Sequence, residues 1–454
     1  MKNPLYIITL LIGTSLTANA WAETQTWSCG ENCTATLSDN GVMTVSGSGS
    51  MDDYTTDTIP WKDSLESITN VVVQSGITNL GVRSFQGATN LVSASLPEGL
   101  TSIGNGAFNK ASSLTTINIP STVTTIGNGA FQYASSLQSI NLPDGLTSIG
   151  THAFNHAESL TSLVIPETVT SIGRTAFQGT TSLESINIPS GITEIGDYMF
   201  YGAENLKNLI LPDGITSIGY ASFYNANSLE SINIPSSVES IGDFAFKYAY
   251  SLTDIEFQEG LKTIGDSAFE ATSLGRVELP DSIISIGDYA FGQAYAYNDI
   301  LTNRIDTIIL GENLQEIGNV AFSRNTATTI ILPESLFADG RELNPYAFEY
   351  SKISTMYCPA GNEQCLSFTP LHCNGDIDED GTCLGEIVPS AIQLTISTYT
   401  ITPNGTYILD GMKYASFADM QKNENGKALR RIYTVDEAER ASKKRGNVLK
   451  LRYK

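Results

Sequence analysis

One apolar residue returns along this chain at a nearly constant interval, and that interval restricts the fold to a stack of similar units. Nine phenylalanines are spaced 23 residues apart, and three more continue the series after one deletion and two insertions: Phe85, Phe108, Phe131, Phe154, Phe177, Phe200, Phe223, Phe246, Phe269, Phe291, Phe322 and Phe348. A period of about 20 to 50 residues is typical of a solenoid, whose units bury their apolar faces only against their neighbours. We therefore expect about twelve coils around one continuous core.

The coil from residue 99 to 121 shows how one unit should be built. Gly104 allows a change of chain direction, and Asn105 has the side chain of a helix N-cap, so we expect a short helical turn after it. Residues 114–119 should form a short strand with its apolar side chains pointing inward, and Pro120 ends it. Stacked strands pair at about 4.8 Å. The predicted fold is therefore an α/β repeat with a parallel sheet on one face and an internal column of phenylalanines.

The two ends of the chain predict other structures. Lys2 and an apolar run followed by small residues indicate a secretory signal peptide. A hairpin turn at Asn40-Gly41 predicts a β-hairpin cap, in which Trp61 covers the first coil. The C-terminal part predicts a small α+β module with strands near 392–402 and 406–409 and a helix from about 435 to 445. The expected parts are a signal peptide (1–22), an N-terminal cap (23–70), the repeats (71–357), a cysteine-rich segment (358–385) and a basic-ended module (386–454).

Six cysteines lie at the two ends of the repeat array: Cys29, Cys33, Cys358, Cys365, Cys373 and Cys383. In an exported protein an even number of cysteines favours disulfides, and the terminal coils need them most because each has only one neighbour. Cys29 and Cys33 are the expected first pair, and the other four cysteines allow three pairings. Zinc is the competing interpretation, but no C-x2-C spacing occurs.

The formal net charge of −23 is unevenly distributed. Residues 427–454 hold ten lysines and arginines and three acidic residues, a local charge of +7, which leaves −30 on the remainder. An acidic body argues against nucleic acids and anionic membranes as partners. No segment after the signal has the run of about 20 apolar residues that a membrane span needs. The basic tail is suited to an acidic body, a neighbouring molecule or a cell-surface polyanion.

The repeat also resembles a known family. The segment LPDGLTSIGTHAFNHAESLTSLVIP, which begins at Leu142, is similar to the BspA-like (Treponema-type) leucine-rich repeats of bacterial and protist surface proteins. The opening CGENCTATLSDNGVMTVSGSGSMDDY also resembles the N-terminal cap of these proteins. The resemblance implies an exported or cell-surface protein that binds other proteins or mediates adhesion. It transfers neither one particular ligand nor any catalytic residue.

Leucine-rich repeats usually bind through the outward positions of their strands, which here form two columns. One contains Asn118, Asn141, Val164, Asn187, Ile210, Asn233, Glu256 and Glu278, and the other Thr116, Ser139, Ser162, Ser185, Asn208, Ser231 and Asp254. We predict a concave binding strip with these contact residues: Asn118, Asn141, Asn187, Asn233, Asp254, Glu256 and Glu278. Its acidic end favours a basic partner. The alternative is that the Asn and Ser ladders only satisfy one another on a solvated sheet.

The largest interruption of the array, Ala294–Arg304, is a second candidate contact surface. It carries Tyr295 and Tyr297, and tyrosine is common at protein interfaces. The alternative is neutral drift of a surface loop. A further column of carboxylates that follows the repeat's proline, from Glu98 to Glu334, is interpreted as ordinary turn chemistry.

Metal sites are weakly indicated. The segment with Asp376, Asp378 and Asp380 resembles the start of a calcium-binding loop. Ile387 stands where the glutamate ligand belongs, which favours an acidic loop without metal. His152 and His156 are spaced to chelate a metal on a helical turn, but sister coils hold other residues in both slots, which favours coincidence.

The sequence therefore predicts an exported, non-enzymatic protein without a cofactor. We expect it to bind an extracellular protein or another surface macromolecule through its solenoid. No nucleophile motif, phosphate-binding loop or HExxH motif occurs, and the chain has three histidines. A structural component that assembles with itself or with the cell envelope is the second hypothesis, and carbohydrate binding is a weaker third.

Overall fold

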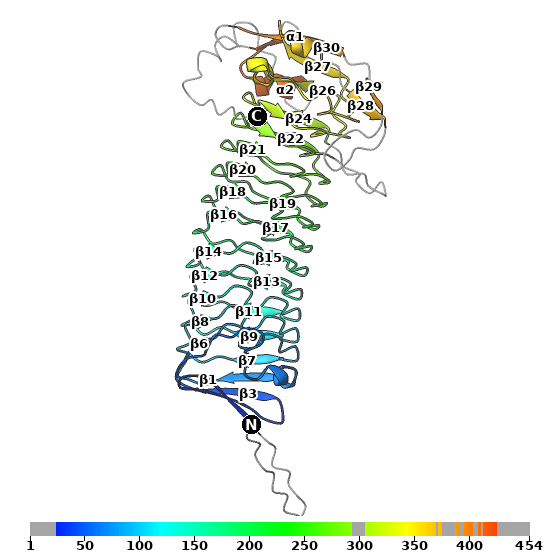
Figure 1. The fold of residues 1–454 in the computed structure, drawn as a ribbon. Coiled ribbons are helices and arrows are strands. Elements are labelled where there is room, and N and C mark those ends of the chain that lie inside the picture. The colour runs from blue at the N-terminus through cyan, green and yellow to red at the C-terminus, as the bar shows by residue number, and fades with distance from the viewer. Residues whose placement is uncertain are drawn as a thin grey trace, which may run out of the picture.

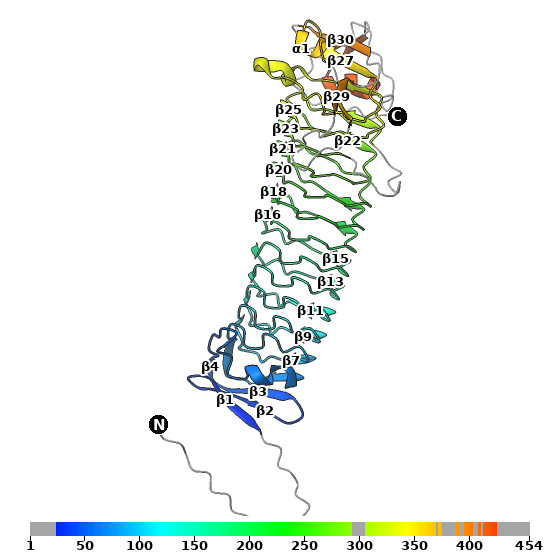
Figure 2. The same ribbon diagram turned by 45° about the vertical axis from the view of Figure 1, so that its right-hand side comes forward.

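The computed structural model is a long column of stacked coils with a cap of strands at its N-terminal end and a small sheet at its C-terminal end (Figures 1 and 2). We number the coils 1 to 12 by their column phenylalanine, from Phe85 to Phe348. The structure describes residues 24–292, 305–368, 371–374, 386–389, 395–402, 407–409 and 412–424. Outside these residues lie the predicted signal peptide, Tyr295, Tyr297, Asp376, Asp378, Asp380, Cys383 and the predicted helix at 435–445.

The predicted phenylalanine column is confirmed. All twelve side chains are buried, with at most 6% of their surface exposed. Consecutive ring centroids lie 5.0 to 5.8 Å apart, with ring planes inclined by no more than 17°. Each ring therefore contacts the ring above and the ring below, an offset stacking that adds to the burial of apolar area.

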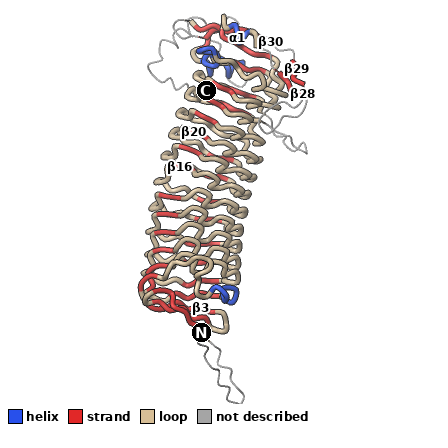
Figure 3. Tube along the Cα trace, viewed as in Figure 1, coloured by secondary structure: helices blue, strands red, loops and turns tan. Residues whose placement is uncertain are grey.

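Two ladders of short parallel strands follow the column, where the sequence predicted one sheet (Figure 3). The first ladder contains β5 (Asn70–Val73), β7 (Ser93–Ser95), β9 (Thr116–Asn118), β11 (Ser139–Asn141), β13 (Ser162–Leu163), β15 (Ser185–Ile186), β17 (Asn208–Leu209), β19 (Ser231–Ile232), β22 (Arg276–Glu278), β24 (Thr307–Ile309) and β26 (Thr329–Ile331). The second contains β4 (Gly49–Ser50), β6 (Ile77–Leu80), β8 (Ser102–Ile103), β10 (Thr125–Ile126), β12 (Ser148–Ile149), β14 (Ser171–Ile172), β16 (Glu194–Ile195), β18 (Ser217–Ile218), β20 (Ser240–Ile241), β21 (Thr263–Ile264), β23 (Ser285–Ile286) and β25 (Glu316–Ile317). The first ladder is the predicted one.

The short helical turn predicted after Asn105 is wrong. The segment around each column phenylalanine is a run of tight turns, in which Ala107 N–H donates to Gly104 O and Ala111 N–H donates to Phe108 O. The two residues that stand two places before and two places after the phenylalanine have φ between 48° and 85° in coils 1 to 9 and in coil 11. Left-handed residues at this spacing exclude a right-handed helix. The Asn105 side chain instead accepts the backbone N–H of Asn128, the same slot of the next coil, at 2.7 Å.

Hydrogen bonds between coils run in opposite directions on different parts of each coil. In the turn segment the earlier coil donates to the later one, as from Phe108 N–H to Ala130 O. Beside the strands many bonds run the other way, as from Thr124 N–H to Thr101 O and from Gly127 N–H to Ile103 O.

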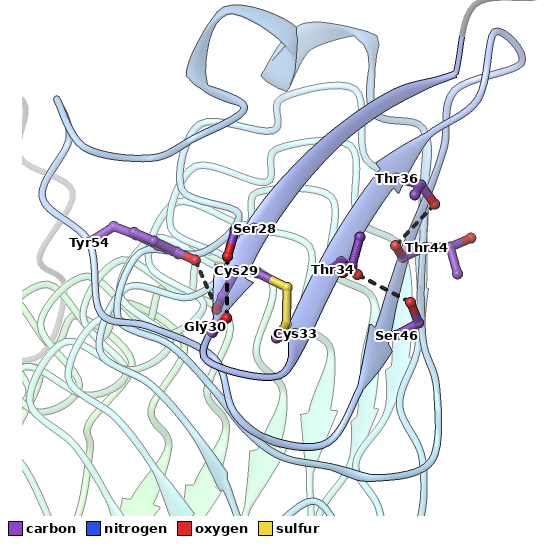
Figure 4. The surroundings of a disulfide bond; sticks show 9 residues. All are labelled: Ser28, Cys29, Gly30, Cys33, Thr34, Thr36, Thr44, Ser46 and Tyr54. Atoms are coloured by element: carbon purple, nitrogen blue, oxygen red, sulfur yellow. Dashed lines mark hydrogen bonds between the residues drawn. A yellow bond between two sulfur atoms is a disulfide. The ribbon is translucent and has the colours of Figure 1, made fainter.

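The N-terminal cap is an antiparallel sheet that continues the first ladder. β1 (Gln25–Gly30), β2 (Cys33–Leu37) and β3 (Val42–Gly47) pair in order, and β3 pairs with β5 in parallel. A disulfide joins Cys29 and Cys33 across the β1–β2 turn, and Tyr54 donates from its hydroxyl to Cys29 O at 3.3 Å (Figure 4). Trp61, next to the 3-10 helix η1 (Lys62–Ser67), extends the phenylalanine column, with its ring 6.1 Å from that of Phe85. Trp61 is 1% exposed, so it closes the core of coil 1 as predicted.

The C-terminal end of the column carries a second small sheet (Figure 2). β27 (Thr355–Pro359) lies parallel between β26 and β30 (Thr395–Ile401), and β31 (Tyr407–Leu409) and β32 (Met412–Tyr414) follow antiparallel. β30 and β31 fall where strands were predicted. The remaining elements are η2 (Glu334–Gly340), α1 (Glu363–Leu366), the antiparallel pair β28 (Leu371–Asn374) and β29 (Glu386–Pro389), and α2 (Phe417–Glu424). A disulfide joins Cys358 of β27 to Cys365 of α1.

Helix α2, which the sequence did not predict, lies against β24 and β26 of the first ladder. The buried amide of Gln421 accepts from Leu310 N–H and donates to Leu310 O, both at 2.8 Å. Tyr399 of the C-terminal sheet and Phe417 of α2 belong to a separate apolar cluster that also contains Ile331. Helix α2 therefore leaves coils 1 to 9 of the first ladder uncovered, and we call this part the open first ladder.

Candidate binding surfaces

The predicted contact residues of the first ladder differ in what their side chains do. Asn118 and Asn141 are exposed at the ends of β9 and β11, whose three residue pairs match in register. Val164 and Ile210 occupy the same column and are 78% and 79% exposed. Coils 2 to 7 therefore present a mixed polar and apolar column, with two isolated aliphatic side chains fully in solvent.

Asn187 and Asn233 hold the scaffold together. The Asn233 side chain accepts from Leu211 N–H at 2.7 Å and donates to Leu211 O at 3.0 Å, so it replaces a backbone strand pair with the preceding coil. Asn187 does the same to Ile165, at 2.7 and 2.8 Å. We call this arrangement an amide bracket. Gln421 of α2 makes a third one on Leu310. Asn187 and Asn233 thus have a structural role, although they bond to the backbone of the preceding coil and not to the other Asn and Ser side chains of the ladders.

Among coils 1 to 11, coil 8 has no strand in the first ladder. Among the described residues, no backbone hydrogen bond joins residues 254–257 to coil 7 or coil 9. The bracketing slot of coil 9 holds Glu278, and a carboxylate accepts hydrogen bonds but cannot donate one to a carbonyl. Phe257 also replaces the smaller aliphatic residue of sister coils, and its ring meets that of Phe269 edge-on, at 5.4 Å and 85°. Neither a strand pair nor an amide bracket therefore joins coil 8 to coil 9 at this position.

A pocket of about 530 Å³ opens at this interruption. Its lining includes Asp254, Glu256 and Glu278, the acidic end of the predicted strip, together with Glu259 and Asp281. Arg276 is the basic residue of the lining, and its Nε donates to Glu278 at 3.0 Å. Five carboxylates facing one guanidinium leave an excess of negative charge, which favours a cationic group.

Some of the carboxylates that follow the repeat's proline contact the next turn. Glu167 accepts from both the backbone N–H and the hydroxyl of Ser190, at 3.0 and 2.9 Å, and these two bonds lower its pKa. Glu98 contacts Ser121 of the next coil in the same way. These carboxylates cap the turn of the following coil.

One aromatic surface was missed by the sequence reasoning. Six rings from the turn segments of coils 6 to 8 contact one another: Tyr198, Tyr201, Tyr220, Tyr224, Phe244 and Tyr248. They are half-buried except for Tyr220, which is exposed. The signal was present, because these residues share the slots that flank the column phenylalanine, but no single coil shows more than two of them.

The two histidines contact residues of neighbouring coils. His152 and His156 occupy the left-handed slots on either side of Phe154. The Nδ1 of His152 lies 2.6 Å from Thr175 Oγ1, and its pKa is lowered by burial and by Arg174. His156 stacks on Tyr133, with ring centroids 5.0 Å apart. Within the described ranges, no group of three potential metal-ligating side chains occurs.

The stacked coils, their paired ladders and the capped ends define a leucine-rich repeat solenoid. Matches to the BspA type leucine rich repeat region cover residues 63–184, 170–298 and 295–372, which together make up well over half of the sequence. The chain belongs to this family. A comparison with curated proteins found no match.

Several solved structures of leucine-rich repeat proteins are similar to this chain at low sequence identity. A leucine-rich repeat protein from Eubacterium ventriosum is 24% identical, and the match covers 73% of this chain and 96% of that protein with a TM-score of 0.43. One from Bacteroides ovatus is 22% identical, with coverage of 72% and 82% and a TM-score of 0.45. A leucine rich cell surface protein from Faecalibacterium prausnitzii is 22% identical, with coverage of 64% and 96% and a TM-score of 0.35. In the described part of this chain, no helix is long and apolar enough to span a membrane.

Proposed function

We propose that this chain is an exported, non-enzymatic protein that binds another protein at the cell surface through the open first ladder of its solenoid. The observation that carries this proposal is the acidic pocket at coil 8, where Asp254, Glu256 and Glu278 line one cavity. The family membership supports a binding role, and the surface protein from Faecalibacterium prausnitzii supports the location.

The pocket favours a basic partner. Asp254 and Glu256 are exposed, so each can exchange water for a cationic side chain at little desolvation cost. The unpaired backbone of residues 254–257 adds carbonyl acceptors that a lysine or arginine can use. Helix α2 covers the next coils of the same ladder, so the contact surface is bounded on that side.

A partner screen followed by charge removal tests the proposal. The mature chain is immobilised and tested against host matrix proteins, glycans and the envelope of the source cell. The variant Asp254→Ser/Glu256→Ser/Glu278→Ser should weaken the best protein ligand at least tenfold and reduce its salt dependence. The matched control is Asp144→Ser/Glu194→Ser/Glu230→Ser, which removes the same charge from exposed positions elsewhere. Equal affinities of both variants would remove the pocket from the proposal.

The second candidate is a structural component that assembles with itself or with the envelope. Val164 and Ile210, exposed in the same column two coils apart, are the apolar side chains that such a contact would cover. Self-association or envelope binding alone in the same screen would replace the adhesion hypothesis with this one. Carbohydrate binding would appear as a glycan ligand whose affinity is insensitive to the pocket variant.

A further inference from the structure

We propose that the aromatic surface of coils 6 to 8 is a second contact surface, which binds arginine side chains on an exposed segment of a partner protein. It rests on the proposed function only in taking a protein as the partner, because it uses the turn segments and not the first ladder. Its members are Tyr198, Tyr201, Tyr220, Tyr224, Phe244 and Tyr248, which we call the aromatic ring cluster.

The ring contacts of the cluster form two branches that start at Tyr198 and end at the same lysine. Tyr198 contacts Tyr201 and Tyr220, with centroid distances of 5.9 and 5.1 Å. From Tyr201 the contacts continue to Tyr224 at 4.8 Å. Tyr224 contacts Tyr248 at 5.3 Å, and Tyr220 contacts Phe244 at 5.4 Å. The two branches meet at Lys247, whose Nζ lies 5.2 Å from the ring centroids of both Phe244 and Tyr248.

Lys247 shows which chemistry this surface accepts. Its ammonium group lies against two aromatic rings and forms an ion pair with Glu270 at 2.8 Å, with both side chains at least 85% buried. A cation thus already occupies one position of the cluster. The remaining rings offer the same combination of π-system and nearby carboxylate, which binds arginine better than lysine because guanidinium stacks on aromatic faces.

The surrounding charge is also complementary to a cation. Asp197 directly precedes Tyr198, and Asp243 directly precedes Phe244. The Asp197 carboxylate accepts a hydrogen bond from the Tyr220 N–H at 2.9 Å. Asp243 in turn accepts the N–H of Asp266 at 2.9 Å. Apart from Lys247, residues 197–250 hold one other basic residue, Lys207, which pairs with Glu184 at 3.1 Å.

The backbone of the cluster does not require aromatic side chains. Tyr198, Phe244 and Tyr248 hold left-handed conformations, with φ of 55°, 58° and 65°. Other coils fill the same slots with glycine, as at Gly129, or with other residues, as at Lys110. Because the scaffold accepts many residue types there, the rings can be replaced without breaking the coil.

Glycine substitution therefore separates stability from binding. In Tyr198→Gly/Tyr248→Gly, the relief of two left-handed residues should offset part of the lost ring packing, so the protein should stay folded, which its melting temperature checks. Affinity for a labelled peptide of alternating glycine and arginine, measured by fluorescence anisotropy at high salt, should fall about tenfold. Lys110→Gly is the matched control, since it relieves a left-handed residue in coil 2, outside the cluster, and should leave affinity unchanged.

A second pair of variants tests the inference if the double variant folds poorly. Lys247→Ala empties the position that the lysine occupies and should increase affinity for the arginine peptide. The control is Lys262→Ala, which removes the same charge from an exposed ion pair with Glu239 and should increase the affinity less. Equal gains would overturn the inference. Unchanged binding by Tyr198→Gly/Tyr248→Gly would also overturn it, while loss in Asp254→Ser/Glu256→Ser/Glu278→Ser alone would leave only the proposed function standing.

Discussion

Replacement of Asn233 by alanine tests whether the amide bracket is structural. The Asn233 side chain satisfies both the N–H and the carbonyl of Leu211, a residue whose surface is 1% exposed. A protein hydrogen bond contributes a net of about 0.5 to 1.5 kcal/mol, so the loss of two should cost about 1 to 3 kcal/mol. The cost should be local, because each coil contacts only its neighbours.

The assay must read that local cost. Because each coil contacts only its neighbours, a local measurement reports this cost more directly than a global free energy of unfolding. Hydrogen exchange measured by mass spectrometry on a peptide that contains Leu211 should be about fivefold to more than a hundredfold faster in Asn233→Ala. Asn118→Ala is the control, because Asn118 is exposed on a fully paired strand and should change stability by less than about 0.5 kcal/mol. Unchanged exchange at Leu211 would refute the bracket and return Asn233 to the candidate ligand contacts.

Three other substitutions test the scaffold. Phe154→Ala removes a fully buried ring and should cost about 3 to 5 kcal/mol, with faster hydrogen exchange confined to its own and the adjacent coils; a uniform change along the column would contradict the stacking argument. Asp266→Asn keeps an oxygen for the N–H of Asp288 but removes a carboxyl whose pKa is raised by burial and by neighbouring acids. A raised pKa in the folded state means that the folded state loses stability as pH rises. The variant should therefore have a higher melting temperature than wild type at neutral pH, and the same melting temperature at a pH below the usual aspartate pKa range. The opposite pH dependence would refute the assignment. Lys110→Gly should stabilise coil 2 by about 1 kcal/mol, seen as a higher melting temperature, and a lower one would show that the left-handed slot carries no strain.

The scaffold was predictable because its period is carried by a buried side chain. Phe108 and its equivalents must be apolar, so the sequence repeats them and the column follows. The second ladder was missed because strands such as β8 (Ser102–Ile103) are two residues long and show no alternation. The helical turn was predicted wrongly because Asn105 has the side chain of an N-cap, whereas the glycine at position 106 and its counterparts mark left-handed slots. Only superposition of the coils on their phenylalanines reveals that second pattern.

The candidate surfaces were predictable in position but not in role. Asn118 and Asn233 are equivalent in sequence, yet one faces solvent and the other binds the preceding coil. The distinguishing signal lies one coil earlier, where an apolar residue such as Ile210 precedes the bracketing asparagine. The aromatic ring cluster assembles residues from three coils, and its contacts depend on the turn geometry that the sequence reasoning had replaced with a helix.

The opposed directions of the hydrogen bonds between coils have a consequence for the ends of the column. Peptide dipoles in the turn segments point one way along the long axis, and many of those beside the strands point the other way, so they largely cancel. A long helix accumulates about half an elementary charge at each end, which a terminal residue of opposite charge must offset. This column accumulates far less, so its ends need an apolar cover more than a compensating charge. Trp61 supplies such a cover at one end, and the disulfide-linked Cys358 and Cys365, which belong to the same apolar cluster as Phe348, supply it at the other.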